Sequence, residues 1–233
     1  MLKIDLHIHT LHSGHAYGSF YDVVNEAKRK KMSMIAITDH GPDMIGASGW
    51  YHFGIGYRRP EYKNLKVLWG CEANIIDAKG NIDLNEDIQK KLDIILVGFH
   101  KMDKYKDAGI KGNTKAMISA LKNPHIKVLT HPANGQYDYD FEKVCKAAID
   151  NNVLLELNLA YLKNSNEEKL LMLKKMIDMT RSAGKKIIIN SDAHFIHEIG
   201  DDSILKKYWT KLGLSKNIIM NNYPDELMKF LKK

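Results

Sequence analysis

The sequence predicts an α/β fold: a closed or nearly closed barrel of seven parallel strands with helices outside, like a TIM barrel. Continuous apolar runs, as expected for parallel strands buried on both faces, alternate with stretches of helical spacing. Almost every apolar run also ends at a histidine or a carboxylate. A barrel brings the carboxyl ends of all its strands to one mouth. An open doubly wound sheet, the alternative, builds its site from the few strands at a switch point.

Seven apolar runs account for the strands. They span residues 3–9, 33–38, 66–73, 93–99, 127–130, 154–157 and 186–190. Apolar residues at helical spacing predict helices over 19–31, 114–121, 141–151, 167–183, 203–212 and 224–231, with a short run at 217–220. No Pro/Gly/Ser-rich linker interrupts this series, so residues 1–233 are expected to form a single barrel domain.

The composition is that of a soluble globular protein, with 44% hydrophobic and 27% charged residues among 233. No apolar run is long enough for a membrane span, and the N-terminus enters a strand pattern at once, unlike a signal peptide. Cys71 and Cys145 are the only cysteines and lie far apart in the sequence, which indicates a reducing compartment. We therefore expect a cytoplasmic protein without a membrane partner.

The formal net charge is +7, which is compatible with a nucleic acid or a phosphate-bearing partner. The excess lysines are spread over several expected helices and do not form one stripe. A lysine-rich surface is therefore the favoured interpretation, and nucleic acid is a possible partner that is not favoured.

The segment 41–62 breaks the alternation of strands and helices. It is long, aromatic and rich in glycine, and it follows the second expected strand directly. Long loops in compact domains are usually functional, so we expect a lid or a substrate-recognition loop over the barrel mouth. A loosely ordered surface insertion is the alternative.

Two histidines in the first expected strand point to a metal site. His7 and His9 are two residues apart, so their imidazoles face the same side of the strand and suit one metal. Glu72 lies within an apolar strand, where a carboxylate is costly unless it is paired or binds metal. Alternation places Glu72 opposite Cys71 and Ala73, and a carboxylate is able to bridge two ions. We therefore expect Glu72 to be a bridging ligand.

Further donors follow the other strands. His40, His100, His131 and His194 each come after a strand, Asp192 precedes His194 by two residues, and His12 and His15 lie in the loop after the first strand. Asp39 is expected to point away from His40 and to orient a ligand through its second nitrogen. Asp5 is expected to share the face of His7. One histidine at a strand end is usually structural, but this number predicts a multi-metal site.

The ordered motifs resemble those of the PHP (polymerase and histidinol phosphatase) domain family. They are H-x-H-x5-H at His7, His9 and His15, then TDH, GCEAN, GFH, THP and SDAH. The resemblance covers nearly the whole chain and is closest to compact stand-alone bacterial phosphatases, whose D-G-x-I-D-like turn reads AKGNID here at 78–83. It implies a distorted (β/α)7 barrel with its metal site at the C-terminal ends of the strands.

The resemblance also implies three divalent metal ions, usually zinc and sometimes manganese or iron. Carried over by motif, one ion takes His7, His9, Glu72 and Asp192, a second shares Glu72 and adds His100 and His131, and a third takes His15, His40 and His194. All nine positions hold the expected residue types.

The expected activity is hydrolysis of small-molecule phosphomonoesters by a hydroxide that bridges two ions. The expected catalytic residues are Glu72 and Asp192, with His12 or a water as the proton donor. Arg58 and Arg59 are candidates for phosphate binding, although an exposed basic turn is the favoured interpretation. Two other classes stay open: a nuclease or phosphodiesterase acting on nucleic-acid ends, and a metal-binding regulatory protein without turnover.

Overall fold

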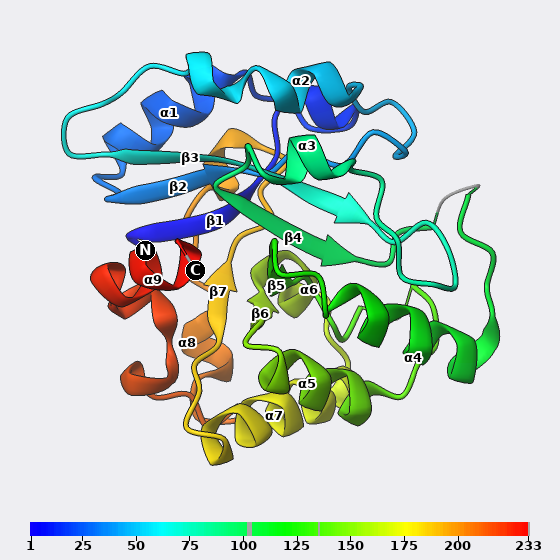
Figure 1. The fold of residues 1–233 in the computed structure, drawn as a ribbon. Coiled ribbons are helices and arrows are strands. Elements are labelled where there is room, and N and C mark those ends of the chain that lie inside the picture. The colour runs from blue at the N-terminus through cyan, green and yellow to red at the C-terminus, as the bar shows by residue number, and fades with distance from the viewer. Residues whose placement is uncertain (102–103, 135, 233) are drawn as a thin grey trace.

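The computed structural model describes residues 1–101, 104–134 and 136–232. Within them, seven parallel strands form one nearly closed barrel in the order β1 to β7 (Figure 1). The strands are β1 (Ile4–Ile8), β2 (Met34–Ile37), β3 (Lys66–Asn74), β4 (Ile94–Gly98), β5 (Ile126–Leu129), β6 (Leu154–Asn158) and β7 (Ile188–Asn190). The predicted α/β barrel is confirmed, and each expected strand is found with its ends displaced by at most two residues.

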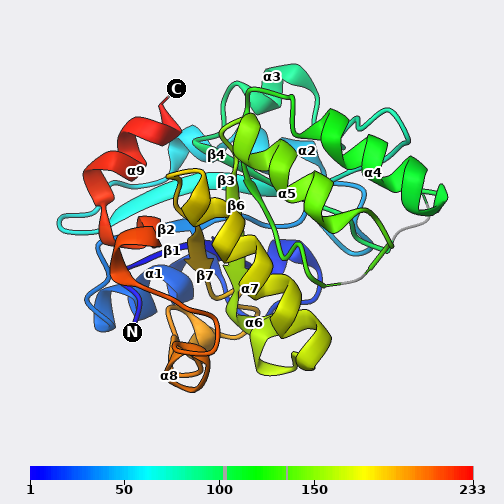
Figure 2. The same ribbon diagram turned by 90° about the horizontal axis from the view of Figure 1, so that it is seen from below.

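The longer helices lie outside the barrel, and α4, α5 and α7 pack side by side in that order (Figure 2). They are α1 (Phe20–Arg29), α4 (Gly109–Ala120), α5 (Phe141–Asp150), α7 (Glu167–Ser182) and α9 (Pro224–Leu231). Three of them begin at a side chain that accepts a backbone N–H of the first turn, namely Ser19, Asp140 and Asn166. None of the helices in the described residues combines the length and the apolar character that a membrane crossing needs.

The expected helix at 203–212 was wrong in length. Only α8 (Leu205–Tyr208) is helical there, because the amides of Lys207 and Gly213 bond carbonyls three residues back in turns. Several short elements were not predicted, since one or two turns carry too little periodicity. They are α2 (Trp50–Gly54), α3 (Glu86–Gln89), α6 (Leu159–Lys163) and the 3₁₀ turns η1 (Leu11–Ser13), η2 (Gly56–Arg58), η3 (Ile196–Glu198), η4 (Lys216–Ile218) and η5 (Met220–Asn222).

Asparagine side chains close the barrel between β1 and β7, which lie side by side (Figure 2). At the mouth, the backbone of His9 donates to Ala193 O at 2.9 Å. Deeper in the barrel, Asn190 Oδ1 accepts from Leu6 N at 2.9 Å. Asn221 of η5 accepts from Ile189 N and donates to Ile4 O, both at 2.9 Å. β1 and β7 do not form a regular ladder of backbone hydrogen bonds with each other. The side-chain amides of Asn190 and Asn221 take its place, so the backbone groups of the two strands stay paired.

The register of β1 shifts between Asp5 and Ile8, and this shift decides which residues face the barrel interior. Ile4 and Leu6 pack in the interior core, whereas Ile8 packs in the outer cluster. The expectation that Asp5 shares the face of His7 was therefore wrong. The carboxylate of Asp5 instead accepts from Ser191 Oγ at 2.5 Å and from Gly200 N at 2.9 Å. Asp5 thus ties the end of β7 to β1.

Candidate metal centre

Glu72 stands at the centre of a cluster of imidazoles at the barrel mouth, and only 1% of its surface is exposed. Its Oε1 lies 3.2 Å from His100 Nε2 and 2.8 Å from His131 Nε2. Its Oε2 lies 3.3 Å from His7 Nε2, 3.4 Å from His9 Nε2 and 2.8 Å from His40 Nδ1. The two oxygens therefore face different groups of nitrogen donors, which lie in or shortly after four strands, β1, β2, β4 and β5.

A second carboxylate joins the pair on β1. The Nε2 atoms of His7 and His9 lie 3.0 Å apart, and Asp192 Oδ1 lies 3.4 Å from the first and 3.1 Å from the second. This agrees with the expectation that the H-x-H pair aims at one point, which the register shift in β1 makes possible.

The remaining histidines form a layer of imidazoles nearer the solvent. The ring of His15 lies 4.9 Å from that of His40 and 4.8 Å from that of His194, centroid to centroid. The ring of His194 also stacks on His9 at 4.3 Å. The structure therefore brings all nine predicted donors to one mouth.

Two of these donors have a backbone conformation that residues other than glycine rarely adopt. His131 has a φ of 29° and Asp192 a φ of 56°, both in the left-handed region. Such strain concentrates at functional sites, where the surrounding structure holds it in place.

The donor set fits divalent cations. The groups His9/His40/His194, His7/His9/Glu72 and His40/Glu72/His100 each have donor atoms within 4.8 Å of one another. Among the described residues, His40 Nδ1, Glu72 Oε2, His100 Nδ1 and Asp192 Oδ1 are buried without a partner in hydrogen-bond geometry. Buried polar atoms without partners are costly, and cations at this mouth would satisfy them. Nitrogen and carboxylate donors suit zinc, manganese and iron.

The electrostatics favour the metal-binding protonation states of His40 and Glu72, whereas nearby carboxylates outweigh burial and raise the pKa values of His7 and His131. Burial, and after it the proximity of His9 and His100, lowers the pKa of His40 to about 3 despite the opposing charge of Glu72. Burial alone would raise the pKa of Glu72, but His7, His100 and His40 outweigh it and hold that pKa well below its usual range. A neutral imidazole and an ionised carboxylate are the forms that bind a metal.

Three residues that were not predicted hold the imidazoles in place. Glu156 Oε1 lies 2.8 Å from His7 Nδ1, Ser13 Oγ lies 2.9 Å from His9 Nδ1, and Asn134 Nδ2 lies 2.6 Å from His131 Nδ1. Glu156 had a signal in the sequence, since it is a carboxylate within the apolar strand LLELN, like Glu72. Ser13 and Asn134 lie in loops and had none.

Asp39 supports a ligand, but indirectly. Its Oδ1 accepts from Ser13 Oγ at 2.7 Å, and Ser13 contacts the second nitrogen of His9. Burial would raise the pKa of Asp39, but hydrogen bonds from His52, Ser13 and Thr10 outweigh it and lower that pKa to about 2. An ionised Asp39 thus anchors the loop that follows β1.

The contacts of His12 and Arg59 are with residues other than the nine predicted donors. The ring of His12 stacks on His52 at 4.1 Å, and its Nδ1 lies 2.9 Å from Ser48 Oγ, on the rim. Arg59 donates to Asp93 at 2.5 Å and to Val67 O at 3.1 Å, near the start of β4 and away from the mouth. Arg59 therefore fastens the end of the long segment and is not placed to bind phosphate at the cluster.

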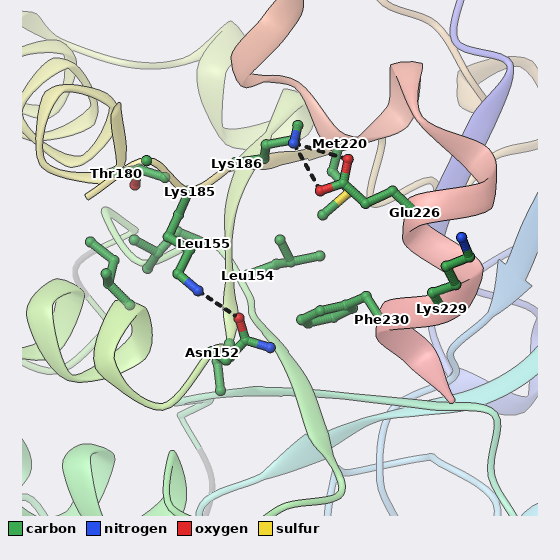
Figure 3. A pocket seen from close by; sticks show the side chains of 13 residues that line it. Asn152, Leu154, Leu155, Thr180, Lys185, Lys186, Met220, Glu226, Lys229 and Phe230 are labelled. Atoms are coloured by element: carbon green, nitrogen blue, oxygen red, sulfur yellow. Dashed lines mark hydrogen bonds and ion pairs between the residues drawn. The ribbon is translucent and has the colours of Figure 1, made fainter. Parts of the chain in front are cut away.

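A cavity of about 360 Å³ lies at the opposite end of the barrel, between α9 and the start of β6 (Figure 3). Leu154, Met220 and Phe230 line it, and its cationic rim is partly paired: Lys186 contacts Glu226 at 2.8 Å. The N-terminal end of such a barrel contributes to stability rather than to catalysis.

The comparisons with known proteins agree with this geometry. A family model described as the PHP domain matches residues 5–212. This chain belongs to the PHP domain family. A protein named probable phosphatase from Thermoanaerobacter sp. strain X514 is 36% identical over 237 residues, covering 100% of this chain and 95% of the relative.

Solved structures share the PHP-type barrel. A zinc, L-histidinol and phosphate complex of histidinol phosphate phosphatase from Lactococcus lactis matches with a TM-score of 0.62 and 16% identity, covering 91% of this chain and 94% of that one. A chain of an archaeal ribonuclease P complex with mature tRNA matches with a TM-score of 0.64 and 19% identity, covering 98% and 91%. At these identities the likeness concerns the fold alone.

Proposed function

We propose that this PHP-domain chain is a metal-dependent phosphatase that hydrolyses small-molecule phosphomonoesters. The observation that carries the proposal is the placement of Glu72, whose Oε1 approaches His100 and His131 while Oε2 approaches His7 and His9. One carboxylate so placed has an oxygen for each of two ions. Relatives named probable phosphatases, 36% identical over the whole chain, support the same activity.

We assign three ions to three sets of donors. One set is His7, His9, Glu72 and Asp192, the second is Glu72, His100 and His131, and the third is His15, His40 and His194. His40 Nδ1 lies 2.8 Å from Glu72 Oε2, the oxygen that faces His7 and His9, and its ring stacks against that of His15, so it stands between the first and third sets. Zinc is proposed first, since it has the highest affinity of the three candidates, with manganese or iron as alternatives. The zinc in the Lactococcus complex supports this order.

The chain's own residues set the geometry in which a phosphate would bind. When bound, divalent ions supply positive charge for the phosphoryl oxygens and make water a better nucleophile. Glu156 and Ser13 each contact the second nitrogen of one imidazole, which fixes that ring and its tautomer, and Asn134 Nδ2 contacts Nδ1 of the His131 ring. Rings held in this way keep the centre arranged before the substrate arrives.

Tyr161, in α6 directly after β6, adds a hydroxyl beside the cluster. Its ring lies 5.1 Å from that of His131. Burial, and after it the charges of Asp192 and Glu72, raises its pKa, so the phenol stays protonated at neutral pH. We assign it as a hydrogen-bond donor to a phosphoryl oxygen. His12 is the weakest of the proposed catalytic residues, because burial and the neighbouring His52 lower its pKa and leave it a poor acid at pH 7.

The function is tested by measuring metal content and then assaying four substrates in parallel. They are an aryl phosphate, a bis-aryl phosphodiester, single-stranded DNA and a dihydropyrimidine-type amide. We expect bound divalent metal and turnover of the aryl phosphate that disappears after chelation and returns with metal. Turnover of the diester or the DNA alone would favour the nuclease alternative. Bound metal without any turnover would favour the regulatory one.

A further inference from the structure

The segment 46–52 of the long loop rests against residues 10–15, which join the proposed ligands His9 and His15. The backbones of Gly14 and Gly46 touch so closely that a Cβ on Gly14 would lie 2.4 Å from Gly46 C. Ser48 N donates to His12 O at 2.8 Å, and the ring of His52 stacks on that of His12. The segment 46–52 is therefore packed against the loop that follows β1.

A buried path of hydrogen bonds continues from this contact to a proposed ligand. His52 Nε2 lies 3.2 Å from Asp39 Oδ2, and Asp39 Oδ1 accepts from Ser13 Oγ at 2.7 Å. Ser13 Oγ then lies 2.9 Å from His9 Nδ1. Asp39 is 1% exposed and Ser13 is fully buried, so solvent does not compete for these bonds.

The helix that carries His52 is fixed on one side and open on the other. Phe53 of α2 is buried, and its carbonyl accepts from Trp69 Nε1 at 3.2 Å. The neighbouring Trp50 and Tyr51 are 61% and 81% exposed. The position of α2 therefore decides how two large aromatic side chains are presented beside the mouth.

We propose that His52, Asp39 and Ser13 are positioning residues that couple metal binding at His9 to the seating of residues 46–52. A metal that fixes the His9 ring also fixes the nitrogen that Ser13 contacts, and Ser13 and Asp39 then hold His52. Coupling of this kind is reciprocal. The factor by which bound metal favours the seated segment is also the factor by which the seated segment strengthens metal binding. The inference rests on the metal-binding part of the proposed function and not on the phosphatase activity.

Hydrogen exchange of the full chain, with and without added Zn²⁺, tests this coupling. We expect Zn²⁺ to slow exchange of the amides in 46–54 by roughly tenfold, in the usual range of coupling between sites. His52→Ala should abolish this slowing and weaken Zn²⁺ binding, measured by competition with a chelator, by about 10-fold or more. His52→Gln, which keeps an N–H donor toward Asp39, should restore most of both effects.

His125→Ala is the matched control, because it also removes a partly buried imidazole but lies directly before β5, at the opposite end of the barrel. It should leave both measurements as in the wild type. Exchange of 46–54 that does not respond to bound Zn²⁺, or wild-type affinity in His52→Ala, would overturn the coupling. A chain that binds Zn²⁺ but hydrolyses no phosphomonoester would overturn the proposed activity and leave the coupling intact.

Discussion

Glu156 Oε1 lies 2.8 Å from His7 Nδ1, the imidazole nitrogen that does not face Glu72. The same carboxylate accepts from Asn190 Nδ2 at 2.9 Å, and its Oε2 accepts from His131 N at 2.8 Å and from Asn158 Nδ2 at 2.9 Å. Each of its oxygens therefore faces two donors, an arrangement that a carboxylate satisfies and an amide does not. One buried side chain thus positions two proposed ligands from different strands.

Glu156→Gln is expected to damage the centre although it conserves shape. The amide nitrogen of the new glutamine would face N–H donors where the carboxylate oxygen accepted from them. The lost hydrogen bonds should lower the free energy of unfolding by about 1–3 kcal/mol. Metal affinity should fall about 10–100-fold, as for other residues that orient ligands. Urea unfolding and chelator competition measure the two effects. Asp178→Asn, a partly exposed carboxylate of α7, is the control, and equal metal affinity in both variants would contradict the assigned role.

Glu72→Ala is expected to abolish phosphatase activity and to release metal, because it removes one donor from two sets at once. Metal content per chain, measured by mass spectrometry after dialysis, should fall by at least one ion. Glu86→Ala, on the exposed side of α3, should keep the wild-type content. A Glu72→Ala protein that is folded and retains its full metal stoichiometry would refute the bridging role.

The closure of the barrel gives a stability prediction. Asn221→Ala would leave Ile4 O and the amide of Ile189 without their side-chain partner inside the protein. We expect a loss of about 3 kcal/mol in the free energy of unfolding, measured with urea, from these unpaired buried groups. Asn222→Ala, next to it but exposed, should cost less than about 1 kcal/mol. Equal losses in the two variants would show that Asn221 does not hold the seam.

Strand periodicity was sufficient to predict the barrel, and residue spacing together with the family resemblance singled out the nine side chains that the structure brings to its mouth. The seven buried strands read as continuous apolar runs, and Glu72 could be assigned to the interior because alternation along β3 is regular. The face of Asp5 could not be predicted, because the register shift in β1 arises from pairing with β2, which a single strand does not encode. The positive φ values of His131 and Asp192 were not predicted either.

Supporting contacts were harder to predict than ligands. Ser13 reaches His9 only because η1 turns the chain back toward the mouth, and Asp39 reaches it only through Ser13. Ser13 is a small and common residue, and Asp39 is far from His9 in the sequence, so neither spacing nor residue type marks them. Arg59 shows that residue type alone also misleads. It is a basic residue in the long segment 41–62, which suggested phosphate binding, but it pairs with Asp93 near the start of β4.

Protein stripped of metal is expected to lose stability as the pH falls from 7 to 5. Burial lowers the pKa of His9 and His15 and lowers that of His40 to about 3, so below pH 6.5 the unfolded chain takes up protons that the folded chain does not. For His40 alone the loss at pH 5 is about 2 kcal/mol. His7 and His131, whose pKa values are raised because nearby carboxylates outweigh burial, offset only a small part of it. Their contribution is complete below pH 6.5 and is lost only as the pH rises through the folded-state pKa.

Urea unfolding between pH 7 and pH 5 measures how steeply the free energy of unfolding depends on pH, and this dependence should be shallower in His40→Asn. A free energy of unfolding that stays constant or rises toward pH 5 would show that these imidazoles are not held neutral in the folded chain.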